Sequence, residues 1–191
     1  MLTLITIILS SSVLAALFTS LTNLYLKRKE LYVQIKLEEK NKWITDIDNG
    51  IKQYTSKVTD YNNDLMRFSK NEIDRNNIAN KLILCKKAHN NLIFYIYQAE
   101  YNIERIEEIE SVMEEVTDTI NIQRENVIKF KNNEISYGEL SDAMGISEKE
   151  IGGKTYEISE KLGVLIRLEK MELTNVALSN IIKKITAKVL K

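Results

Sequence analysis

Two residues that could form a nucleophile and its base stand four positions apart in the chain. They are Cys85 and His89, the only cysteine and the only histidine. A thiol beside an imidazole can react as a thiolate in covalent catalysis. Both residues, however, fall within a line of apolar residues at helical spacing, where a helix packs on its neighbour. The spacing therefore favours a buried cysteine and a histidine on a packing face, and no further ligands for a metal stand nearby.

The acidic run Glu104–Glu115 offers a second kind of chemistry, because paired carboxylates can transfer protons or hold metal pairs. Metal sites in helical bundles need a glutamate three residues before a histidine, and Lys86 occupies that position. The run is more typical of a solvated helix face. The sequence from Gly152 to Thr155 (GGKT) imitates the end of a phosphate loop but lacks its leading glycine and its strand. We expect no catalytic residue, no cofactor, no metal and no enzymatic activity.

The segment Gly138–Lys154 (GELSDAMGISEKEIGGK) resembles a bacterial helix-turn-helix, with Gly145 at its turn. In such proteins the second helix enters the major groove of DNA. Here that helix would carry Glu148 and Glu150 as well as Lys149, so it would repel phosphate as much as attract it. A corner between two helices explains the same residues, and DNA binding is the weaker interpretation.

The elements that position these residues begin with an uncharged run, Leu4–Leu26. As a helix it is long enough to cross a hydrocarbon core of roughly 30 Å. A cleaved signal peptide is the main alternative, but its basic start is missing and its apolar core would be shorter. We expect a transmembrane anchor at residues 1–26. It is followed at once by basic residues, which place the following chain on the cytoplasmic side; these are Lys27, Arg28 and Lys29.

Small residues line one face of the expected span, where Ser12, Ala16 and Ser20 follow one another at intervals of four. Such spacing lets two membrane helices approach closely. We therefore consider self-association through this face, although serine and alanine are also simply tolerated in membrane spans.

An unbroken series of apolar residues at alternating steps of three and four follows the basic cluster. This pattern is the a/d seam of a coiled coil, and it predicts one helix running to about Phe68. The seam comprises Ile44, Ile47, Ile51, Tyr54, Val58, Tyr61, Leu65 and Phe68.

A polar turn is expected near residues 69–77, followed by a second helix with its own seam from Ile78 to Ile106 and onward to about Phe130. Residues 27–130 would thus form a long helical hairpin. Residues 131–153 hold four of the six glycines and predict a connector with one short helix. Residues 154–191 predict an amphipathic helix that packs on the hairpin. Its last lysines indicate either a cationic helix end or contact with anionic lipid.

Composition excludes several classes of protein. The 191 residues contain no proline and a single cysteine, and 27 basic residues balance 27 acidic ones. A disulfide-bonded scaffold, a proline-rich linker and a strongly basic nucleic-acid binder are therefore excluded. The fold class that we predict is all-α, with an N-terminal transmembrane helix followed by an elongated antiparallel bundle or coiled-coil hairpin.

The layout resembles a loose group of small bacterial single-span membrane proteins with a helical cytoplasmic domain. The likeness rests on the anchor with its basic stop, on the segment from Lys36 to Ile47 around Trp43, and on Asn80–Lys87 (NKLILCKK). It covers the first half of the chain. Some members of this group are encoded near mobile elements or phage-defence genes, and the resemblance carries over no functional residue.

We therefore expect a non-enzymatic, single-pass protein of the bacterial inner membrane, with its N-terminus outside and its helical bundle in the cytoplasm. The bundle would be a scaffold or an interaction or oligomerisation module, with the membrane and a protein partner or a second copy as its contacts. The alternative is a membrane-perturbing effector of a phage-defence or toxin-type system. A membrane-tethered regulator that binds DNA is the third interpretation.

Overall fold

The computed structural model describes the backbone of residues 2–100 and 102–189, and the side chains of residues 15–100 and 102–174. These residues form four helices and no strand, so the predicted all-α class is confirmed. They divide into two compact units, Met1–Lys42 and Trp43–Lys191. The two units are described separately below.

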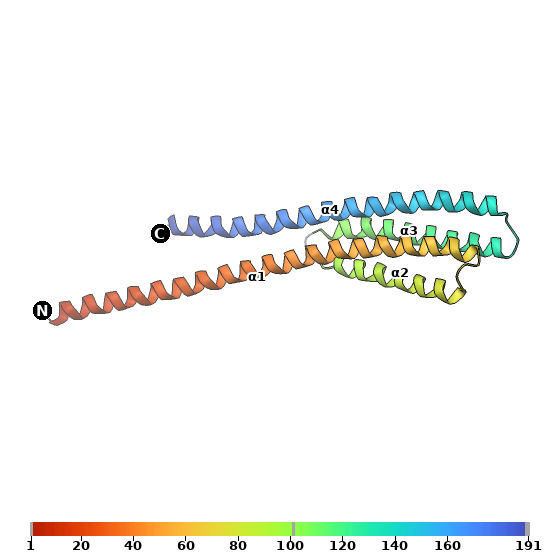
Figure 1. Ribbon diagram of the computed structural model, residues 1–191. Coiled ribbons are helices and arrows are strands. Elements are labelled where there is room, and N and C mark those ends of the chain that lie inside the picture. Colours follow the sequence, from red (N-terminus) through yellow and green to blue (C-terminus); the bar gives the residue numbers. More distant parts are fainter. Residues whose placement is uncertain (1, 101, 190–191) are drawn as a thin grey trace. The chain divides into compact units, whose positions relative to one another are not determined.

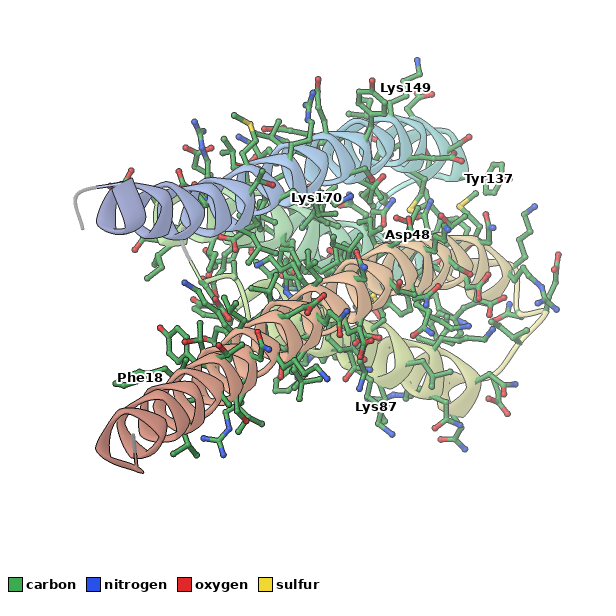
Figure 2. The ribbon with its side chains drawn as sticks, turned by 90° about the vertical axis from the view of Figure 1, so that its left-hand side faces the viewer. Phe18, Asp48, Lys87, Tyr137, Lys149 and Lys170 are labelled. Carbon is green, nitrogen blue, oxygen red and sulfur yellow. The ribbon has the colours of Figure 1, made fainter. Side chains whose placement is uncertain are left out.

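The first unit is the N-terminal part of helix α1 (Leu2–Ser69). Proline is absent and glycine does not occur before Gly50, so nothing in the sequence interrupts the helix there. Large apolar side chains lie exposed along it, among them Leu17 (54% exposed) and Phe18 (68%). Figure 2 shows Phe18 projecting from the helix.

The second unit is an antiparallel bundle of the rest of α1, α2 (Arg75–Ile96), α3 (Ile103–Lys131) and α4 (Tyr137–Val189) (Figure 1). The indole Nε1 of Trp43 donates a hydrogen bond of 2.7 Å to the carbonyl oxygen of Tyr95, which ties the start of this part of α1 to the end of α2. Lys161 Nζ lies 3.4 Å from Glu108 Oε2, so α4 runs back along α3. Each helix therefore runs opposite to the one before it.

All four helices contribute to a single apolar core. Its buried residues recur at steps of three and four along each helix, which is the spacing of one helical face. The largest fully buried side chains are Tyr54, Tyr61, Ile47, Leu65, Leu92, Ile96, Ile106, Ile109, Met113, Leu140, Ile158 and Leu165.

Asparagine, not glycine, closes two of the turns. Asn71 and Asn133 each have φ of 59° and follow the ends of α1 and α3. After Asn71, the N–H of Glu72 donates to the carbonyl of Arg67 at 2.9 Å, and after Asn133 the N–H of Glu134 bonds to Lys129 in the same way. This is the Schellman arrangement, which needs a left-handed residue that asparagine tolerates better than most.

Side chains also fix where two helices begin. Asp74 caps α2, since its Oδ1 accepts a hydrogen bond of 2.8 Å from the N–H of Asn77. Ser136 and Glu139 form a reciprocal capping box at the start of α4, with bonds of 2.7 and 3.3 Å. These caps satisfy N–H groups that a helix leaves unbonded in its first turn.

The second predicted helix is divided in the structure. We expected it to continue to about Phe130, but α2 ends at Ile96 and α3 starts at Ile103. The N–H groups of Glu100 and Asn102 bond to the carboxylate of Glu169 on α4 instead of to carbonyls of their own helix. A contact 67 residues away in the chain therefore stabilises the break, and local spacing did not reveal it.

The predicted connector at residues 131–153 is also corrected, because only the turn before Tyr137 is outside a helix. Helix α4 passes through Gly138, Gly145, Gly152 and Gly153 without interruption. Each glycine costs a helix about 1 kcal/mol relative to alanine. Burial of Leu140, Met144 and Ile151 on the core face offsets that cost, since burying one such side chain contributes about 1.5–3 kcal/mol. The C-terminal helix thus begins 17 residues before Lys154, at Tyr137.

Candidate functional site

The seam predicted on the first helix lies on the inner face of the second unit. Three of its eight residues, Ile44, Ile51 and Phe68, are partly buried and pack against the core. The other five are at most 1% exposed: Ile47, Tyr54, Val58, Tyr61 and Leu65. The seam therefore contributes to the interior of the bundle within one chain.

Cys85 and His89 both lie on the inner side of α2, opposite the tyrosines of α1. The rings of Tyr54 and His89 meet edge to face, with centroids 5.8 Å apart. Cys85 is 5% exposed. This places the thiol inside a packing face, as the apolar spacing of the sequence indicates.

The electrostatics of this region oppose nucleophilic catalysis. Burial raises the pKa of the Cys85 thiol to about 11, so almost none of it is thiolate near neutral pH. Burial also lowers the pKa of His89, against the opposing effect of the carboxylates of Glu110 and Glu114. Both groups are therefore held in their neutral forms by the same desolvation.

Several buried polar atoms find no hydrogen-bond partner among the described residues. They include the hydroxyls of Tyr54 and Tyr61 and both ends of the amide of Gln123, which is fully buried on α3. Burial raises the pKa of both tyrosines, that of Tyr61 to about 12. Such groups destabilise a core by roughly 1–3 kcal/mol each when nothing bonds to them.

Glu169 is a fully buried charged residue that sequence analysis missed. Its carboxylate is fully buried and accepts bonds from the backbone N–H of Glu100 at 3.2 Å and from the N–H and Nδ2 of Asn102, both at 3.1 Å. The sequence did contain a sign that Glu169 is buried, because this residue stands four positions after Leu165 on the apolar face of α4. A glutamate at such a position needs buried partners.

Two glutamates of the acidic run on α3 pair with neighbouring cations. Glu108 contacts Arg105 at 2.9 Å and Lys161 on α4, and the bond from Arg105 is the main reason its pKa is lowered. Glu115 pairs with Lys154. In the part of the chain that the structure describes, no group of three or more potential ligands gathers as a metal site would require.

The helix-turn-helix interpretation is wrong, because α4 continues through Gly145, where the turn would lie. Neither Gly152 nor Gly153 has a positive φ, so no phosphate-binding loop forms there. The lysine that follows them, Lys154, pairs with Glu115, and this bond is the main reason its pKa is raised.

An open groove of about 610 Å³ lies between α1 and α4 within the second unit. Its walls are apolar, with Ile47 and Ile51 on one side and Leu162 and Ile166 on the other. Small and polar residues line the remainder, and Asp48 and Lys52 pair on its α1 side at 2.5 Å. Figure 2 shows Asp48 on α1.

The residues expected to pack in a membrane lie on the first unit. Ala16 and Ser20 are exposed, and the side chain of Ser12 lies outside the described residues. Lys27 and Arg28 are exposed and Lys29 is half-buried. Among the described residues, no helix combines the length and the apolar character needed to cross a membrane. The predicted span Leu4–Leu26 lies partly outside them, since the side chains of residues 4–14 are not described.

Comparison with protein families, with curated proteins and with solved structures finds no match to this chain.

Proposed function

We propose that this protein is a membrane-anchored helical scaffold, held by the N-terminal part of α1 and presenting its bundle on the cytoplasmic side. The observation that carries the proposal is the exposure of large apolar side chains along the first unit. From Leu17 to Leu37 ten such residues are between 41% and 68% exposed. Apolar surface of this extent marks contact with lipid or with another protein.

The distribution of charge in the sequence supports contact between the start of the first unit and lipid. No charged residue occurs before Lys27, and basic residues then follow at once. Positive charge next to a span is retained in the cytoplasm, so the second unit is proposed to lie there.

The bundle itself supports a binding role and not a catalytic one. Its thiol is buried, and burial lowers the pKa of its half-buried imidazole. Two glutamates of its acidic run pair with Arg105, Lys154 and Lys161. Its open features are the groove between α1 and α4 and exposed apolar residues such as Ile146 and Tyr156, at 68% and 71%. A protein partner or a second copy is the proposed occupant of such surfaces.

The anchor is tested by expressing the full chain in bacteria and washing the membranes with alkaline carbonate. Integral proteins stay in the pellet after this wash. We expect wild type to stay there and the double variant Leu17→Lys, Leu21→Lys to be released, because a lysine inside the hydrocarbon core costs about 2.5–3.5 kcal/mol. The matched control changes two exposed apolar residues of α3, Ile122→Lys with Ile128→Lys, and should stay in the membrane. Release of the wild-type chain would overturn the proposal.

A measurement of membrane potential in the same cells distinguishes a scaffold from a membrane-perturbing effector. Ala16 is small and exposed, as a close helix contact within a membrane requires. A dye for membrane potential should report no depolarisation for a scaffold, with or without Ala16→Leu. If the wild-type chain depolarises the membrane and Ala16→Leu abolishes this effect, the scaffold proposal is overturned in favour of the effector.

A further inference from the structure

Helix α2 has apolar side chains on its outer side as well as on its core side. Ile83 is 51% exposed, Phe94 is 64% exposed, and Tyr97, which caps the end of α2, is 55% exposed. The buried residues Cys85 and Leu92 lie on the other side of the helix, because at 100° per residue they stand about 180–200° away from Ile83. The outer residues are therefore not part of the core of the bundle.

These outer residues belong to a regular stripe, which we call the α2 stripe. It consists of Ile83, Lys87, Asn90, Phe94 and Tyr97, all of which are exposed. Figure 2 shows Lys87 projecting from α2. The residues follow one another at steps of four and three, which is the spacing of a helix that packs on another helix. Asn90 stands at the midpoint, and a polar residue within such a stripe fixes the register of two helices.

The two ends of the α2 stripe carry opposite charge. Lys86 and Lys87 are exposed beside its first half, and α2 has no acidic residue from Arg75 to Ile96. At the other end, the hydroxyl of Tyr97 donates a hydrogen bond of 2.7 Å to Glu110 on α3. This bond is the main reason that the pKa of Tyr97 is raised, and the charges of Glu110 and Glu107 raise it further. Two carboxylates therefore lie beside the end of the stripe.

This pattern of charge decides which partner fits. An anionic membrane, a nucleic acid or a purely acidic protein would be repelled by Glu107 and Glu110. A second copy, turned by half a rotation about an axis through Asn90, brings its acidic end to the basic end of the first copy. The same rotation places Ile83 of one copy opposite Tyr97 of the other. A parallel arrangement would instead bring Lys87 of the two copies together.

We propose that the outer face of α2 binds a second copy of this chain in an antiparallel contact with two-fold symmetry. This inference rests on the binding role proposed for the bundle and does not use the anchor. Each apolar contact and each pair of opposite charges occurs twice in such a dimer. The stripe measures roughly 21 Å at 1.5 Å per residue, so the interface is small and the dimer should dissociate on dilution.

Cross-linking through single cysteines tests the orientation. All variants carry Cys85→Ala, and the full chain is extracted in a mild non-ionic detergent so that two bundles can meet in any orientation. The short cross-linker bismaleimidoethane should join two copies of Asn90→Cys, since this position lies at the axis. It should not join two copies of Ile83→Cys, whose thiols would lie roughly 21 Å apart along the helices.

A mixture of chains completes this test. Tyr97→Cys alone should give no cross-linked dimer, but a mixture of Ile83→Cys with Tyr97→Cys should give one. Circular dichroism checks that each variant keeps its helicity. Cross-linking of all three single variants would overturn the proposal, because it indicates a parallel or unspecific contact. The absence of any cross-link would overturn it as well.

An exchange of charge tests what holds the two copies together. The variant Lys86→Glu with Lys87→Glu should weaken the dimer about tenfold, because each repulsive contact occurs twice. The variant Glu107→Lys with Glu110→Lys should weaken it to a similar degree. A mixture of these two variants should restore the dimer, since each then has the charges that complement the other. A mixture that cross-links no better than its components would contradict the proposed contact.

The matched control reverses two exposed lysines of another helix, Lys149→Glu with Lys170→Glu. Figure 2 shows both lysines on α4. This variant should cross-link through Asn90→Cys as well as the unchanged chain does. Loss of the cross-link here would overturn the proposal, because net charge and not the α2 stripe would then control association.

The carbonate wash separates this inference from the anchor. A chain that cross-links through Asn90→Cys but is released from membranes by the wash keeps the α2 contact and loses the anchor. A chain that stays in the pellet and gives no cross-link keeps the anchor and loses the α2 contact.

Discussion

The carboxylate of Glu169 on α4 accepts a hydrogen bond of 3.1 Å from the backbone N–H of Asn102, at the start of α3. Asn102 makes no capping bond of its own, so a residue from another helix performs that role. A carboxylate at this position is also stabilised by the positive end of the α3 dipole. One buried charge thus fixes the break between α2 and α3 and the alignment of α4 along α3.

Removing the charge of Glu169 should weaken the whole bundle. We expect Glu169→Gln to lower the free energy of unfolding by about 2 kcal/mol, because bonds to a buried carboxylate contribute about 1.5–3 kcal/mol. Urea titration followed by circular dichroism measures this change. The control is Glu160→Gln on the exposed side of α4, which should move the midpoint very little. Equal effects of the two variants would show that the Asn102 contact contributes nothing.

Glycines of α4 and α1 should respond to alanine in opposite directions. At Gly153 an added Cβ meets nothing within 4 Å, so Gly153→Ala should stabilise the protein by about 0.5–1 kcal/mol through helix propensity. At Gly50 the added Cβ would lie 3.2 Å from Leu92 Cδ1 and 3.3 Å from Tyr95 Cδ2. We expect Gly50→Ala to destabilise by about 1 kcal/mol through overpacking. Thermal melts of the two variants measure the contrast, and a gain of stability at both positions would contradict the packing of α1 on α2.

The buried hydroxyl of Tyr61 should be dispensable. Because it has no hydrogen-bond partner among the described residues, Tyr61→Phe is expected to raise the free energy of unfolding by about 1 kcal/mol. The control is Tyr97→Phe, which removes an exposed bond of 2.7 Å to Glu110 and should change stability very little. Chemical denaturation distinguishes the two, and a loss at Tyr61 would indicate a partner for its hydroxyl.

The thiol of Cys85 should be protected from reagents in the folded protein. It is buried, and its pKa of about 11 leaves very little thiolate at pH 8. A chromogenic disulfide reagent should therefore react at the rate of unfolding, and immediately in concentrated urea. In a Cys85→Ala background, the exposed replacement Ser56→Cys should react at once without urea. Rapid reaction of native Cys85 would mean that the face between α1 and α2 opens easily.

Stability should fall when the pH drops below the ordinary pKa of histidine. Burial lowers the pKa of His89 in the folded state, so the unfolded chain binds the proton more readily. The resulting loss of stability is absent above about pH 6.5, and it grows as the pH falls from there toward the pKa of His89 in the folded protein. Melting temperatures between pH 7.5 and pH 5, roughly spanning that interval, should decline more in wild type than in His89→Gln. Parallel curves for the two proteins would show that His89 keeps its ordinary pKa.

The sequence by itself determined the helical class, because it lacks proline and repeats its apolar residues at steps of three and four. The same spacing placed Ile47, Val58 and Leu65 on one face, and all three are buried. The polar segment after Phe68 marked the turn before α2. These features depend on local periodicity, which a single chain displays without its tertiary structure.

Only the tertiary structure decided where the later helices break and where they continue. Spacing predicted one helix through residues 97–102, but Glu169 binds the N–H groups there from a distant part of the chain. Glycine content predicted a connector before Lys154, but the packing of Leu140 and Met144 keeps α4 helical. In both cases a contact between helices outweighs a local preference of about 1 kcal/mol, and such contacts exist only once the bundle has formed.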